Sequence, residues 1–158
     1  MLSTTVKACA PMRMLAALAM LLLASLSVPA HAERTHVQGA YTVHYNAIPT
    51  TVLSPDIARH YGITRSAGRG LINIAVLRRD GEATQPQAVR ARVLAHVRSL
   101  IGQRIPVELR EVVEQDAVYY IGDFRVRGEE RLRFELEVTP DGARLPIPVR
   151  FEQDFVGD

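Results

Sequence analysis

Residues 131–138 read Arg-Leu-Arg-Phe-Glu-Leu-Glu-Val, with an apolar residue at every second position and a charged residue between. Successive side chains of an extended strand point to opposite faces. This alternation is therefore typical of a strand with one face buried and the other in water. We expect the buried face to carry Leu132, Phe134, Leu136 and Val138.

Six further segments alternate in the same way or form short apolar runs bounded by turn residues. Residues 71–77 are almost continuously apolar, as expected of a strand buried on both faces. Glycine-containing turns follow at 80–81 and at 140–142. The six segments are 41–46, 71–77, 89–97, 107–113, 118–126 and 147–155.

One short helix is predicted between the first two strands. Ser54 is a preferred N-cap residue, Pro55 suits the first helical position, and Gly62 after Tyr61 ends the helix. Together with the strands, this helix predicts an all-β protein. The expected fold is a single antiparallel β-sandwich of immunoglobulin-like type, with about seven strands and one short helix between the first two.

Residues 88–101 admit two interpretations. Val89, Val93, Val97 and Ile101 recur every four residues, which fits one face of a helix. The same stretch alternates regularly between β-branched or small apolar residues and arginine or histidine, which favours a strand. We prefer the strand.

The first 32 residues have the order of a secretory signal. Lys7 and Arg13 precede an apolar run over 14–26, and Ala30 and Ala32 supply the small residues that a signal peptidase reads. The run is too short to span a bilayer as a helix, for which about twenty residues are needed. We therefore expect a signal peptide over 1–32, a β-sandwich domain over 33–158, and a periplasmic location.

Cleavage after Ala32 would change the composition. Lys7 and Arg13 would leave, so the 19 basic residues would fall to 17 and equal the 17 acidic ones. A neutral domain has no overall field that attracts nucleic acid. Cys9, all four methionines and the only lysine would also leave. This excludes disulfides, thiol nucleophiles and Schiff bases in the mature chain, a stable lipid anchor is not expected, and we predict no cofactor.

The mature sequence resembles the bacterial family called domain of unknown function 4426. The most specific part of the resemblance lies in segments 43–48, 53–55, 61–63, 65–66 and 70–76, and segments 102–103, 119–121 and 151–155 fit the later pattern. The resemblance implies a small exported protein rich in strands. It brings no established activity, substrate or catalytic residue.

The residue pattern predicts neither a catalytic set nor a metal site. His36, His44, His60 and His96 are not spaced as metal-ligand pairs. Of the serines beyond the signal, none stands in Gly-x-Ser-x-Gly or another turn that exposes a nucleophile. Arginine and glutamate alternate on the strands, which is typical of a solvated sheet face.

The sequence leaves two functional hypotheses open. The first is a non-enzymatic binding or interaction module for an envelope protein or small ligand, which uses an exposed sheet edge or the loops 46–54 and 65–70. The second is a protein that binds a small ligand or anion, or hydrolyses one, in a pocket around His44, Asn46, Tyr61, Arg65 and Asn73. Ser66 lies in the glycine-containing basic loop of the same region, and this loop is a candidate for cradling an anion.

Two amides on apolar stretches stand out, Asn73 and Gln153. If their strands are buried, each amide needs hydrogen-bond partners inside the domain. A tie between strands is the expected role, and a ligand site is the alternative.

The exported protein should begin at Glu33. Intact-mass measurement of the protein from a periplasmic extract checks this expectation. Retention of residues 1–32 would contradict the signal peptide and the domain boundary together.

Overall fold

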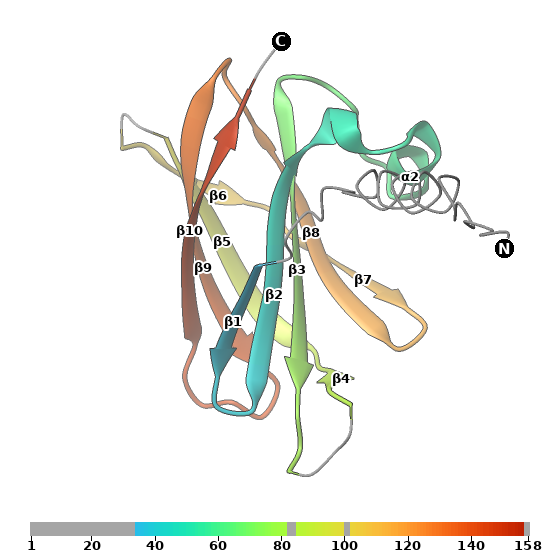
Figure 1. Cartoon of the computed structure of the whole chain (residues 1–158), viewed down its shortest axis with the longest axis vertical. Helices are drawn as coiled ribbons and strands as arrows, with labels where there is room; N and C mark the ends of the chain where they lie inside the picture. Colours follow the sequence, from blue (N-terminus) through green and yellow to red (C-terminus); the bar gives the residue numbers. More distant parts are fainter. Residues whose placement is uncertain (1–33, 82–84, 100–101, 157–158) are drawn as a thin grey trace, which may run out of the picture. The chain divides into compact units, whose positions relative to one another are not determined.

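The structure is a computed structural model that describes residues 34–81, 85–99 and 102–156. In these residues the chain forms ten strands in two antiparallel sheets that pack face to face (Figure 1). The expected antiparallel β-sandwich is confirmed. No helix in the described part of the chain is long and apolar enough to cross a membrane.

The first sheet has the order β1-β2-β3-β8-β7, with the short β4 paired to β3. The second sheet has the order β10-β9-β5-β6. The strands of the first sheet are β1 (Arg34–Gln38), β2 (Tyr41–Pro49), β3 (Arg69–Arg78), β4 (Gln87–Ala88), β7 (Arg110–Glu114) and β8 (Ala117–Arg125). Those of the second are β5 (Ala91–Arg98), β6 (Arg104–Val107), β9 (Glu130–Pro140) and β10 (Ile147–Phe155).

The chain has more strands than the seven expected. The predicted strand 107–113 is wrong as a single element, because it divides into β6 and β7, which belong to different sheets. Between them Glu108 and Leu109 cross over β8 at Gly122, so closely that a Cβ there would collide with the Glu108 carbonyl. The strands β1 and β4 were not expected at all.

Residues 91–98 form the strand β5, so the helical alternative for 88–101 is wrong. Ala95 and Val97 are buried in the core, and β5 pairs with β9 from Ala91 to Arg98. Ile101 lies outside the described residues.

The expected helix is present as α2 (Pro55–His60), which follows the single 3-10 turn η1 (Thr50–Val52). The Ser54 side chain accepts a hydrogen bond from the backbone N–H of Ile57 at 3.2 Å. Gly62, with φ of +60°, ends the helix in a conformation that favours glycine. The segment 50–68 therefore connects β2 to β3 (Figure 1).

Aromatic side chains from both sheets meet at the centre of the core. Phe134 is fully buried and stacks on Phe151 with ring centroids 4.7 Å apart. Phe124 of the opposite sheet meets Phe134 edge-on at 5.1 Å. The predicted inward face of β9 is confirmed, since Leu132, Phe134, Leu136 and Val138 are all at most 2% exposed.

Phe134→Ala should lower the free energy of unfolding by about 3–5 kcal/mol, because it removes ring contacts to both sheets and leaves a cavity. Arg133→Ala should cost less than about 1 kcal/mol, since its ion pair with Glu152 lies at the surface. Urea unfolding of the two variants measures both values. Equal, mild effects would contradict the central place of Phe134.

Candidate functional site

The outer face of the first sheet, which points away from the core, carries most of the residues predicted from the sequence. In the register of β2 with β3, Asn46 lies opposite Asn73 and His44 opposite Ala75. Val43 and Ala47 of β2 are buried in the core, so His44 and Asn46, at the alternate positions between them, point outward. Asn46 and Asn73 are therefore direct neighbours on this outer face.

The loop between β2 and β3 closes on itself through Thr50. This threonine is fully buried, and its hydroxyl donates to the Ser66 carbonyl at 3.0 Å. The same oxygen accepts the Ser66 backbone N–H at 2.9 Å. Arg65 donates to the Thr51 carbonyl at 2.9 Å. Both ends of the segment 50–66 are thus held together, with α2 between them.

Residues of β7 fasten the far end of α2. The Tyr61 hydroxyl donates to the Glu114 carboxylate at 2.6 Å, and the Arg110 guanidinium donates to the Tyr61 carbonyl. The hydrogen bond to Glu114 is the main cause that raises the pKa of Tyr61, and burial adds to it. His60 Nε2 lies 3.6 Å from the same carboxylate.

A pocket of about 220 Å³ lies between this segment and the outer face of the sheet. Its polar residues are Asn46, Tyr61 and Asn73, and the rest of its lining is aliphatic except for Tyr119. The Asn73 Oδ1 atom is buried and has no hydrogen-bond partner in the described structure. The internal partner expected for this amide is missing. Gln153 donates to the carbonyl of its neighbour Asp154 at 3.0 Å, which is a bond within β10 and not the expected tie between strands.

The structure brings together three of the six residues predicted as a site. Asn46, Tyr61 and Asn73 line the pocket, whereas His44, Arg65 and Ser66 do not. His44 is half-buried on the same sheet face, two residues before Asn46. Arg65 and Ser66 make the bonds that close the loop.

The sequence reasoning missed the apolar lining supplied by the connecting segment. Leu53, Ile57 and Tyr61 recur every four residues and line the pocket together. This spacing is the signal of one helix face, and in a longer helix it would have been recognised. No comparable sequence pattern indicates that Arg110 and Glu114 of β7 bind Tyr61.

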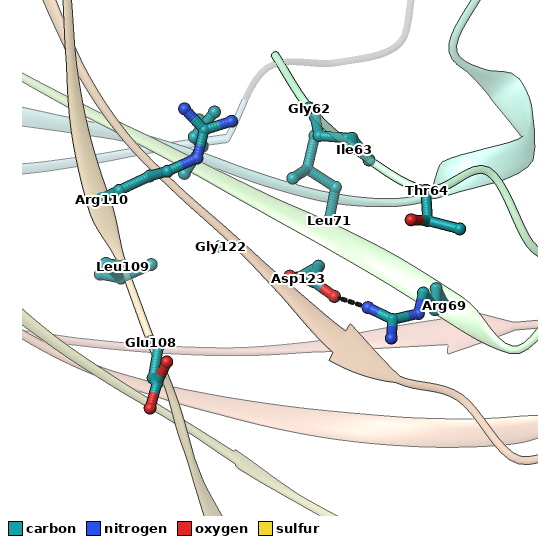
Figure 2. A pocket seen from close by; sticks show the side chains of 11 residues that line it. Gly62, Ile63, Thr64, Arg69, Leu71, Glu108, Leu109, Arg110, Gly122 and Asp123 are labelled. Atoms are coloured by element: carbon teal, nitrogen blue, oxygen red, sulfur yellow. Dashed lines mark hydrogen bonds and ion pairs between the residues drawn. The ribbon is translucent and has the colours of Figure 1, made fainter. Parts of the chain in front are cut away.

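A second, more polar concavity of about 300 Å³ lies next to the pocket and shares Ile63, Leu71 and Ile121 with it. Figure 2 shows Arg69 of β3 paired there with Asp123 of β8. Arg110 also lines this concavity and binds the Tyr61 carbonyl. Both guanidinium groups therefore already have partners.

The fold and these concavities define a class: a mostly β protein of two antiparallel sheets, with a small pocket on the outer face of one sheet. The chain belongs to the DUF4426 family, described as a domain of unknown function, whose model matches residues 35–158. The resemblance seen in the sequence is thus confirmed. No curated protein matches the chain.

Solved structures share this fold. The crystal structure of a DUF4426 family protein from Pseudomonas aeruginosa is 29% identical, with a TM-score of 0.66, over 80% of this chain and 96% of that one. FetP of uropathogenic Escherichia coli, expressed in the periplasm, is 11% identical with a TM-score of 0.57, over 80% and 95%. A copper-bound FetP variant is 12% identical with a TM-score of 0.55, over 80% and 97%.

Tyr61→Phe should destabilise the protein by about 1 kcal/mol at neutral pH, because it leaves Glu114 without the phenol that donates to it. Since the pKa of Tyr61 is raised in the folded state, this contribution is present below the unfolded value of about 10 and is lost as the pH rises through the folded value. Urea unfolding of wild type and variant on both sides of that range measures the difference.

Tyr119→Phe is the matched control, because the Tyr119 hydroxyl makes no hydrogen bond within the part of the chain that the structure describes. It should leave stability unchanged at neutral pH. A cost equal to that of Tyr61→Phe, or one independent of pH, would contradict the role given to the Tyr61–Glu114 bond.

Proposed function

We propose that this protein is an exported, non-enzymatic binding module that holds a compact apolar group with one hydrogen-bond donor. The group enters the pocket of Asn46, Tyr61 and Asn73. The observation that carries the proposal is the buried Asn73 Oδ1 atom, which has no partner in the described structure. A ligand N–H or O–H would supply the missing bond.

The unpaired amide is costly for the protein alone. A buried acceptor without a hydrogen bond costs about 1–3 kcal/mol, whereas an apolar residue of the same shape would cost little. Leucine would fit the aliphatic lining at this position. An amide in that place is therefore better explained by a ligand than by stability.

The size and lining of the pocket narrow the class of ligand. A cavity of about 150 Å³ holds benzene, so the 220 Å³ here correspond to about nine non-hydrogen atoms on the same scale. A flat bicyclic ring with one N–H, such as indole, meets both requirements. The same group occurs as a free small molecule and as the tryptophan side chain of an envelope protein.

Binding is favoured over catalysis by the polar groups in the pocket. The two amides do not titrate, and the Tyr61 phenol is bound to Glu114 with a raised pKa, so it stays protonated at neutral pH. The pocket thus offers hydrogen bonds and apolar surface but neither a nucleophile nor a general base.

The anion-binding alternative has less support. Arg65 binds the Thr51 carbonyl and Arg69 pairs with Asp123, so the two guanidinium groups of the basic loop are engaged. The copper of the FetP variant is not carried over, because no group of three or more His, Cys, Asp or Glu side chains gathers among the described residues.

A periplasmic location is supported by the signal predicted over 1–32 and by the fold shared with FetP.

A comparison of indole with indene tests whether binding requires a hydrogen-bond donor or only apolar contact, because indene has nearly the same shape and lacks the N–H. We expect indole to bind about tenfold more tightly than indene in a titration followed by backbone amide NMR, with shifts centred on 46, 61 and 73. Asn73→Leu should abolish this preference and leave the melting temperature unchanged or higher.

Gln153→Leu is the matched control, since it removes an amide outside the pocket whose own hydrogen bond is satisfied. It should leave the indole preference intact. Equal binding of the two probes to the wild-type protein, or shifts that avoid the pocket, would overturn the proposal. A strong loss of stability in Asn73→Leu would assign that amide a structural role instead.

A further inference from the structure

The sandwich is open where β7 no longer covers the edge of β8. The pairing of β7 with β8 runs only from Ala117 to Ile121, although β8 continues to Arg125. Residues 122–125 pair with β3 on one side alone. Their other edge lies beside β6 of the second sheet, because the chain has crossed between the sheets at Glu108 and Leu109.

A pocket of about 290 Å³ enters the molecule through this opening. Its apolar lining includes Val97 and Leu132 of the second sheet and Phe124 of the first, all of which belong to the core. An apolar chain in this pocket would therefore extend the core between the two sheets. On the benzene scale the space corresponds to about a dozen non-hydrogen atoms.

The polar residues of this pocket carry an excess of positive charge. Arg125 and Arg127 are exposed and have no carboxylate partner among the described residues. Arg69 is paired with Asp123, and Glu130 accepts the Arg127 backbone N–H at 2.6 Å. The pocket is thus lined by three guanidinium groups and two carboxylates, which leaves an excess of one positive charge.

A buried hydroxyl adds a further donor to the same lining. Ser99 Oγ is buried without a hydrogen-bond partner in the described structure. A carboxylate accepts hydrogen bonds from both hydroxyl and guanidinium groups, and such bonds to a charged acceptor are about twice as strong as neutral ones. The pocket therefore offers hydrogen-bond donors to an anion beside the apolar side chains of Val97, Phe124 and Leu132.

We propose that this opening is a second binding site, for a single-chain amphiphilic carboxylate such as a medium-chain fatty acid. The acyl chain lies between the sheets against Val97, Phe124 and Leu132, and the carboxylate lies with Arg125 and Arg127. At this site the protein donates hydrogen bonds to the ligand, whereas in the Asn73 pocket the protein accepts a hydrogen bond from the ligand. The two sites are independent.

Decanoate and decanol test the site, because they share one alkyl chain and differ in the charged head. In calorimetric titrations at neutral pH, below the concentration at which decanoate forms micelles, decanoate should bind about tenfold more tightly than decanol. The double variant Arg125→Gln, Arg127→Gln should lose this preference, and its melting temperature should stay close to that of wild type, since both side chains are exposed.

The double variant Arg92→Gln, Arg150→Gln is the matched control. It removes two exposed arginines from the outer face of the second sheet and changes the net charge equally. It should retain the preference for decanoate, as should Asn73→Leu. Equal binding of decanoate and decanol, or equal loss in both arginine double variants, would overturn the site and leave the Asn73 pocket untouched.

Discussion

The contact of Phe134 with Phe151 and Phe124 is the interaction on which the rest of the structure depends. It joins the two sheets at the centre of the core, and the sequence has no cysteine after Cys9 that could add a disulfide between them. Hydrogen bonds at the margins add to this burial, as the one from the Ala91 N–H to the Tyr120 hydroxyl shows. The need to bury this core fixes which side of each strand faces inward. A shift of one residue in the register of a strand would turn its apolar side chains outward. The outward position of Asn46 and Asn73 follows from the inward position of their neighbours.

The candidate site depends on a different kind of interaction. The six-residue helix α2 is too short to be stable alone, and few of its side chains are buried. Its position is held by Thr50 bonded to Ser66 at one end and by Tyr61 bonded to Glu114 at the other. The lining that this segment supplies to the pocket therefore depends on a few hydrogen bonds at its ends and not on the hydrophobic core.

Elements with a local signal could be predicted, and those held by distant partners could not. The alternation in β9 and the Ser54 cap each lie within a few residues, and both were predicted. The strand β1 was not predicted because it has only one strongly apolar residue, Val37, and therefore no alternating pattern. Val37 is 65% exposed, and β1 is held by backbone pairing with β2. The division of 107–113 depends on Gly122, which is distant in sequence. Arg65 and Ser66 bind within the loop instead of the pocket, because Arg65 donates to the Thr51 carbonyl and the Ser66 backbone pairs with the Thr50 hydroxyl. Bonds to the backbone such as these leave no pattern in the sequence.

Two local conflicts in this sequence coincide with the two proposed sites. Asn73 leaves a buried oxygen unpaired on one pocket, and Arg69 lies directly opposite Arg125 at the other, a like-charge pair that Asp123 only partly offsets. A sequence selected for stability alone would favour leucine at the first position and opposite charges at the second. Other charges on the sheet surfaces are paired, as Arg131 with Asp154 and Arg133 with Glu152 show, but Arg98 also lies opposite Arg104 and Arg133 in the second sheet. We propose that the unpaired Asn73 oxygen and the arginines of the second pocket gain their missing partners when a ligand binds.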